Sequence, residues 1–74
     1  MDDLDLSGLV CPHVVLRLAE RLRAVAPGTR LRVLATDPMS AIDVPFYLGK
    51  VGHVLVSQQR TEGRVTFIVE RGRC

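Results

Sequence analysis

The sequence predicts an α+β fold, a two-layer sandwich in which two helices cover one face of a four-stranded mixed sheet. The hydrophobic pattern alternates between a period of two residues and a period of three to four, in the order βαβαββ. The strand-like segments alternate apolar with polar residues, which leaves the second sheet face open to solvent. We expect one domain over residues 1–74, because a chain of this length builds a single small core.

The first half of the chain predicts a strand, a helix and a second strand. Residues 3–6 alternate polar and apolar before a serine–glycine turn. From Pro12 the apolar residues recur at helical spacing, and the predicted buried stripe is Val15, Leu18, Leu22 and Val25. Pro27 disfavours helical geometry at Ala26, so this helix should end there. Residues 30–36 alternate again and predict the second strand.

A second helix is predicted to run toward Gly52. Ser40 and Asp43 have the spacing of a capping box at its start. Pro45 removes one backbone donor from the expected helix. The regular helix should therefore begin only near Asp43, after one irregular turn.

Residues 53–59 and 64–70 predict two strands joined by a hairpin. The chain has three aromatic residues, two in the predicted second helix and one in the last predicted strand. We expect Phe46 and Phe67 to pack in the core, whereas the spacing leaves Tyr47 undecided between the core and an exposed stacking surface.

Composition narrows the class of protein. The acidic N-terminus lacks the basic and then apolar layout of a signal peptide, and no apolar run reaches membrane-spanning length, so we expect a cytoplasmic protein. Cys11 and Cys74 are too few and too far apart to suggest a disulfide framework or a zinc site. The net charge of +2 is compatible with RNA binding without indicating it.

Cys11 is the residue most suggestive of chemistry. It lies between a predicted strand exit and Pro12, and proline is favourable at the first position of a helix. We therefore expect Cys11 at the N-cap, where unpaired N–H groups and the positive end of the helix dipole lower a cysteine pKa. These residues alone indicate a reactive thiol and leave redox sensing, peroxide reduction and sulfur transfer open.

Three motifs resemble the TusA-like (SirA-like) sulfur carriers, and they are Leu4-Asp5-x-x-Gly8-Leu9-x-Cys11-Pro12, Asp37-Pro38 with Asp43-Val44-Pro45, and Gly52-His53-x-Leu55. The resemblance implies that Cys11 accepts a sulfane sulfur as a persulfide from a donor protein, a cysteine desulfurase or a rhodanese. An acceptor protein then removes it, in tRNA thiolation, cofactor sulfuration or sulfur oxidation. The resemblance implies no cofactor and no metal, and we expect a monomer that acts as a sulfurtransferase-type relay.

The residues around Cys11 have more modest predicted roles. Pro12, His13 and Asp43 are expected to support the site, with His13 exposed on the first helical turn and Asp43 facing Cys11. The family commonly has an acidic residue at position 13 and a second proline where Val14 stands, so the partner proteins of this chain are open. Arg17 and Arg21 are the predicted docking patch for an acidic partner surface.

Two other functions stay open at this stage. A nucleic-acid-binding or regulatory module would use the dispersed arginines and make Cys11 incidental, although the modest charge and few aromatic residues argue against direct nucleic-acid binding. A redox-sensing domain would need a resolving thiol such as Cys74. We expect His53 to make a structural hydrogen bond at a strand start rather than to bind metal.

Overall fold

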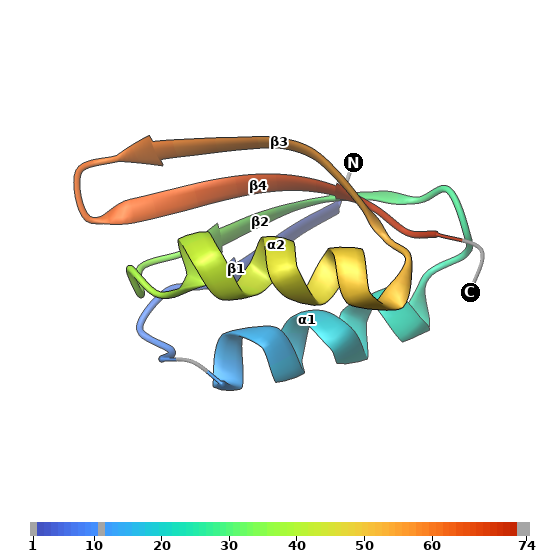
Figure 1. Ribbon diagram of the computed structural model, residues 1–74, viewed down its shortest axis with the longest axis horizontal. Helices are drawn as coiled ribbons and strands as arrows, with labels where there is room; N and C mark the ends of the chain where they lie inside the picture. The colour runs from blue at the N-terminus through green and yellow to red at the C-terminus, as the bar shows by residue number, and fades with distance from the viewer. Residues whose placement is uncertain (1, 11, 73–74) are drawn as a thin grey trace.

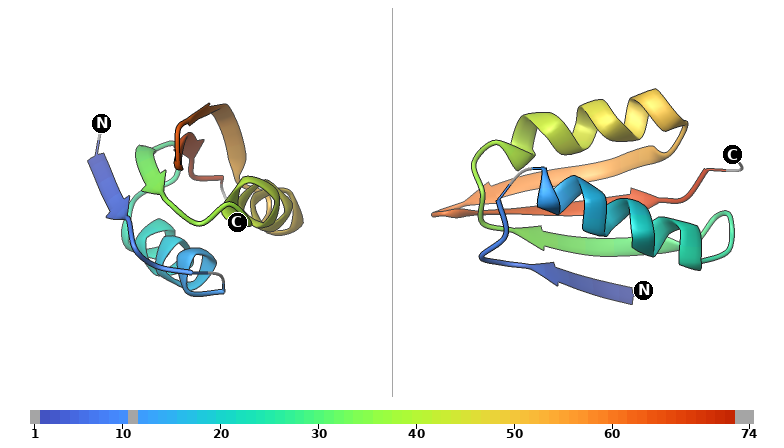
Figure 2. Two further views of the ribbon diagram at one scale, coloured as in Figure 1. Left: turned by 90° about the vertical axis from the view of Figure 1, so that its left-hand side faces the viewer. Right: turned by 90° about the horizontal axis from the view of Figure 1, so that it is seen from below.

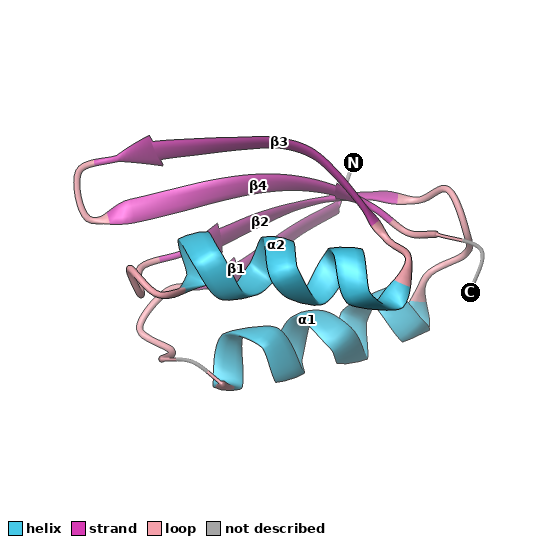
Figure 3. Cartoon of the chain, viewed as in Figure 1, coloured by secondary structure: helices cyan, strands magenta, loops and turns pink. Residues whose placement is uncertain are grey.

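The computed structural model describes residues 2–10 and 12–72. Its elements are β1 (Asp2–Leu6), α1 (His13–Ala24), β2 (Arg30–Ala35), α2 (Ser40–Val51), β3 (Val54–Thr61) and β4 (Arg64–Glu70) (Figure 1; Figure 3). This order confirms the predicted βαβαββ sequence of elements. Both helices lie on the same face of the sheet, as the two further views show (Figure 2).

The four strands form one mixed sheet in the order β1-β2-β4-β3. The β1 and β2 strands are parallel, which requires the crossover through α1, and the other two pairs are antiparallel. The last strand in the chain, β4, therefore lies between β2 and β3. A register irregularity between Leu55 and Ser57 interrupts the pairing of β3 with β4.

Period-two alternation in the central strands determines which side chains enter the core. The inward-facing residues of β2 and β4 are buried, and they are Leu31, Val33, Ala35, Val65, Phe67 and Val69. The opposite face carries charged pairs. Arg30 Nε lies 3.0 Å from Glu70 Oε1, and Arg32 Nε lies 3.5 Å from Asp3 Oδ1. The prediction of one covered and one open sheet face is confirmed.

The α1 helix places its buried stripe differently from the prediction. Val14, Leu18 and Leu22, spaced four residues apart, are fully or almost fully buried. Val15 and Val25, which were predicted to belong to the stripe, are only partly buried and pack at its margin. The helix ends at Ala24 rather than at Ala26, because Val25 already has extended backbone angles, with φ −114° and ψ 159°.

The α2 helix begins at Ser40, and the predicted capping box is wrong. Met39 is the N-cap and makes no side-chain capping bond. The Ser40 side chain is fully buried inside the helix, where its hydroxyl donates to the Asp37 carbonyl oxygen at 2.6 Å. The N–H of Ile42 bonds three residues back, to Met39, and that of Asp43 bonds the same oxygen four residues back. The first turn is tight but already helical, so the prediction that the regular helix begins only near Asp43 is wrong.

Pro45 lies inside α2 without ending it. Proline has no N–H to donate to the carbonyl oxygen of Ala41, four residues back. The side chain of Gln58, on β3, donates its Nε2 to this oxygen at 3.2 Å. The neighbouring strand thus supplies the hydrogen bond that the helix lacks.

The aromatic residues divide between core and surface. Phe67 is fully buried, as predicted, and Tyr47 is half-buried against the core. Phe46 is 71% exposed, so the prediction that it packs in the core is wrong. Val44 and Leu48 occupy the buried side of α2. Phe46 is two positions from each of them, which places it on the opposite, outward side of the helix.

Candidate functional site around the start of α1

The turn after β1 is held by a short network of hydrogen bonds. The backbone N–H of Ser7 donates to Asp5 Oδ1 at 2.9 Å, and the Ser7 hydroxyl donates to the same oxygen. These two bonds lower the pKa of Asp5 below its usual range, the hydroxyl bond contributing most. Gly8 follows with φ +84°, a left-handed conformation that favours glycine. The aspartate and the glycine of the first motif therefore shape the turn.

Thr36 fixes this turn to the sheet. The N–H of Gly8 donates to Thr36 Oγ1 at 2.8 Å, joining two residues that are 28 apart in the chain. Sequence reasoning missed this role, because no local spacing relates the two positions. The segment that leads to Cys11 is consequently anchored at the end of β2, close to where α2 begins.

The α1 helix begins one residue later than predicted. Pro12 is the N-cap, with φ −87° and ψ 3°, and His13 is the first helical residue. The prediction of Pro12 at the first helical position is therefore wrong. The predicted N-cap, Cys11, lies outside the described residues and directly precedes Pro12 in the chain.

The first turn of α1 is well formed and carries no acidic residue. The N–H of His13 donates to Val10 O at 2.8 Å, and that of Leu16 donates to Pro12 O at 3.0 Å. Among the described residues, no side chain makes a capping hydrogen bond at this end of the helix. No carboxylate in this turn therefore offsets the positive end of the α1 dipole, whereas the first turn of α2 contains Asp43.

The predicted supporting residues lie at one end of the molecule. Both helices begin at the same end of the sheet, so Pro12 and His13 lie at the same end as Asp43 (Figure 1). His13 and Pro12 are exposed, and Asp43 is half-buried. Val10 is 60% exposed. Whether Asp43 faces the thiol of Cys11 stays a prediction.

Arg17 and Arg21 are both exposed and share one side of α1. They line a depression of about 370 Å³ between α1 and β1, together with the apolar side chains of Leu6 and Leu9. The structure thus brings the two predicted docking residues together beside the edge strand.

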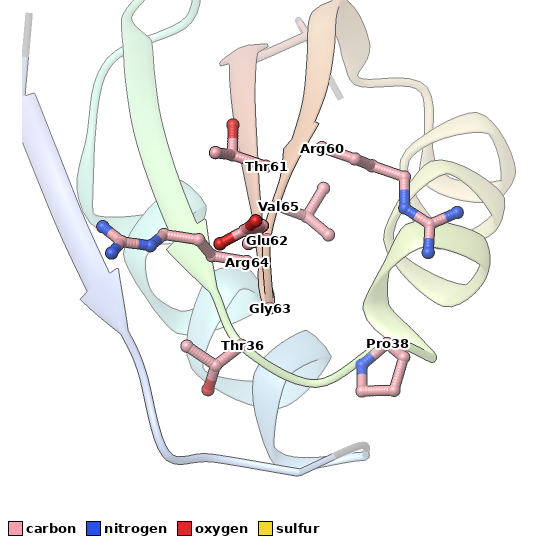
Figure 4. Close-up of a pocket in the computed structure, with 8 residues that line it drawn as sticks. All are labelled: Thr36, Pro38, Arg60, Thr61, Glu62, Gly63, Arg64 and Val65. Carbon is pink, nitrogen blue, oxygen red and sulfur yellow. The ribbon is translucent and has the colours of Figure 1, made fainter.

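A second depression, of about 340 Å³, lies between the β3–β4 hairpin and the end of β2. Thr36 and Pro38 line one side of it, and Arg60 and Arg64 belong to the hairpin (Figure 4). The two guanidinium groups point to opposite sides, with Glu62 between them (Figure 4). Since the cations do not converge, this depression lacks the arrangement that binds a small anion.

His53 makes the structural hydrogen bond that was predicted for it. Its Nδ1 accepts from the backbone N–H of Gly72 at 2.9 Å, and the Tyr47 ring lies 6.4 Å away between centroids. Burial lowers the pKa of His53, and the nearby Arg71 cation lowers it further. Arg71 itself bonds the Val25 carbonyl oxygen through its side chain, so this cluster joins the C-terminal segment to the body of the fold.

Two kinds of site are not found in the described part of the chain. Residues 2–10 and 12–72 contain no group of three or more His, Cys, Asp or Glu side chains placed to hold a metal ion. Neither α1 nor α2 has the length and apolar character needed to span a membrane.

Comparison with known proteins identifies close relatives. The family model described as sulfurtransferase TusA matches residues 2–71. The sulfur carrier protein TusA of Pseudomonas aeruginosa is 40% identical over 68 residues, which cover 92% of this chain and 86% of the relative. The protein of the same name from Pseudomonas putida is 37% identical over 68 residues, covering 92% and 85%. That from Pseudomonas syringae pv. syringae is 36% identical over 69 residues, covering 93% and 82%.

Proposed function

Because the chain belongs to the TusA sulfurtransferase family, we propose that Cys11 carries a sulfane sulfur as a persulfide between a donor protein and an acceptor protein. The observation that carries this proposal is the start of α1. Cys11 immediately precedes the N-cap of a helix whose first turn has no carboxylate. The positive end of the dipole there favours an anion, whether a thiolate or a persulfide.

The proposed transfer conserves atoms and electrons. The Cys11 thiolate attacks the outer sulfur of a donor persulfide, a new S–S bond forms on Cys11, and the donor S–S bond breaks. The donor cysteine leaves as a thiolate, and the proton stays with the transferred sulfur or passes to water. An acceptor thiolate later attacks the outer sulfur of the Cys11 persulfide, and Cys11 leaves as a thiolate. No metal or organic cofactor takes part.

The surroundings of Cys11 suit successive contact with two proteins. Val10, Pro12 and His13, its neighbours in the chain, are all exposed. The anchored turn at Gly8 and the helix at His13 hold the two ends of this segment. A cysteine desulfurase or a rhodanese is the proposed donor, and a thiol of a tRNA-thiolation, cofactor-sulfuration or sulfur-oxidation protein is the proposed acceptor. A reducing compartment such as the cytoplasm would keep the thiol available.

The alternative functions gain no specific support. Two of the strand arginines that a nucleic acid would contact, Arg30 and Arg32, are paired with carboxylates on the open sheet face. A redox sensor that uses both thiols would bring Cys11 and Cys74 together, and both residues lie outside the described part of the chain.

Intact-mass measurement tests the proposal directly. The purified protein is incubated with a cysteine desulfurase and cysteine, or with a rhodanese and thiosulfate. We expect the mass of one sulfur atom to be added to the wild type and to Cys74→Ser, and not to Cys11→Ser. Cys74→Ser is the matched control, since the chain has two cysteines. Equal sulfur uptake by Cys11→Ser, or no uptake by the wild type from an active donor, would reject the Cys11 relay.

A further inference from the structure

The β1 strand is an edge of the sheet with a depression on each of its two faces. On the helix side, the depression of about 370 Å³ is lined by Leu4, Arg17 and Arg21, among other residues. On the open side, a depression of about 240 Å³ is lined by Leu4, Asp3 and Asp5. The first hollow borders the outer side of β1, where no described strand pairs with it, and the second lies over β1 and β2, because Arg32 and Leu34 also line it.

We propose that β1 binds an extended segment of a partner protein, which adds to the sheet as a fifth strand. A sheet edge offers unpaired N–H and C=O groups to such a segment, and these supply affinity without sequence preference. Successive side chains of an added strand point to opposite faces. Every second side chain would therefore point toward the hollow beside α1, and the others would lie on the open face beside Asp3 and Asp5.

Charge determines what kind of segment fits. The helix-side hollow has two exposed cations of α1, Arg17 and Arg21, and two exposed carboxylates, Glu20 and Asp5. Asp5 Oδ1 already accepts two hydrogen bonds from Ser7. The open-side hollow has two exposed carboxylates, Asp3 and Asp5, against Arg32, which is already 3.5 Å from Asp3. A fitting segment alternates acidic or apolar side chains toward α1 with basic side chains toward the open face.

A second copy of this chain does not meet these requirements. If two β1 strands paired antiparallel about a two-fold axis, the Asp3 and Asp5 carboxylates of both copies would lie opposite one another. Arg17 and Arg21 of the two copies would also face each other. Like charges at these positions oppose pairing. The charge pattern therefore favours a partner of different sequence.

The other edge of the sheet is less suitable. The β3 strand has a register irregularity between Leu55 and Ser57, and bulges of this kind interrupt the regular backbone groups that an added strand needs. The β1 strand pairs with β2 in unbroken register from Asp2 to Leu6. The added strand is accordingly assigned to β1.

This surface goes beyond the sulfur chemistry and does not depend on it. The helix-side hollow also includes Leu9, which is two residues from Cys11 in the chain. A partner bound along β1 would thus lie next to the segment that leads to the thiol. Loss of sulfur uptake and loss of segment binding are measured separately, so either proposal can fail alone.

NMR titration with designed peptides tests the inference. The probe is a short, capped peptide with lysine at odd positions and valine and glutamate alternating at even positions. Added to the ¹⁵N-labelled wild-type protein, it should shift the amides of Asp3 to Leu6 and protect those that do not already bond β2. It should bind the double variant Arg17→Glu, Arg21→Glu roughly tenfold more weakly. The double variant Arg60→Glu, Arg64→Glu makes the same charge change on the hairpin and should bind like the wild type.

Each other outcome would overturn the proposal. Shifts confined to β3, or no shifts at millimolar peptide, would exclude strand addition at β1. Equal binding by the Arg17, Arg21 double variant would exclude the charge argument. Concentration-dependent shifts of β1 without peptide would show that a second copy is the occupant.

Discussion

The substitution Gln58→Leu should destabilise the protein by removing the donor that bonds the carbonyl oxygen of Ala41. Pro45 cannot supply this bond from within α2, and Gln58 Nε2 does so across to β3 at 3.2 Å. Leucine preserves most of the bulk of the glutamine side chain and removes its amide. The change therefore tests the hydrogen bond more than the packing.

The expected cost follows from the environment of the bond. A buried carbonyl that loses its partner costs about 1–3 kcal/mol. Ala41 and Gln58 are both only partly buried, so water replaces some of the lost bonding. We therefore expect a loss near the lower end, about 1 kcal/mol, which corresponds to a fall of roughly 4–8 °C in Tm for a domain of this size.

Urea unfolding of a double-mutant cycle isolates the effect. The variant Pro45→Ala restores a backbone N–H that can bond the Ala41 carbonyl within the helix. In that background Gln58→Leu should cost little, giving a coupling energy of about 1 kcal/mol between positions 45 and 58. Equal costs in both backgrounds would refute the reasoning. Gln59→Leu, on the exposed opposite face of β3, is the control and should change stability by less than about 0.5 kcal/mol.

Three further predictions concern the two histidines and the C-terminal segment. The pKa of His53 is lowered in the folded state, by burial first and by Arg71 second. The neutral imidazole therefore stabilises the fold in full above about pH 6.5, and this stabilisation is lost as the pH falls through the lowered pKa. Urea unfolding against pH should show this slope, and His53→Asn, which keeps an acceptor but does not titrate, should remove it. Gly72→Ala should destabilise the protein by about 1–3 kcal/mol, because a Cβ there would lie 2.0 Å from the Gly52 carbonyl oxygen, whereas Gly49→Ala meets nothing within 4 Å and should not destabilise it in the same urea assay. His13→Ala should leave the rate of sulfur uptake within about twofold, because the side chain is exposed on the first turn, and a large loss would give His13 a role in the transfer.

Much of the fold was predictable because two periodicities alternate cleanly. Leu31, Val33 and Ala35 alternate with polar residues, and a strand can bury one such set only on one face. The α2 helix is harder to read, because it has apolar residues on every side. Ile42 and Phe46 are as hydrophobic as Val44 and Leu48, so the pattern does not reveal which pair faces the sheet.

The site was predictable only where it depends on local sequence. The turn at Asp5 and Gly8 and the helix start at Pro12 follow from neighbouring residues, apart from a shift of one position at the N-cap. The hydrogen bond from Gly8 to Thr36 depends on how β1 and β2 pair, and local sequence patterns do not reveal that pairing. Capping rules also failed at Ser40, because burial gave its hydroxyl another partner in Asp37.

The central position of β4 constrains how the chain acquires its fold during synthesis. The strand that separates β2 from β3 leaves the ribosome after both of them, since it spans Arg64–Glu70. Until it emerges, β3 has no strand to pair with, and Phe67 is missing from the core. The pairing of β2 with β4 joins segments that are far apart in sequence, and such contacts form late and slow folding. A nascent chain stalled before residue 64 should therefore remain sensitive to proteases, and it should become resistant only once β4 has left the ribosome.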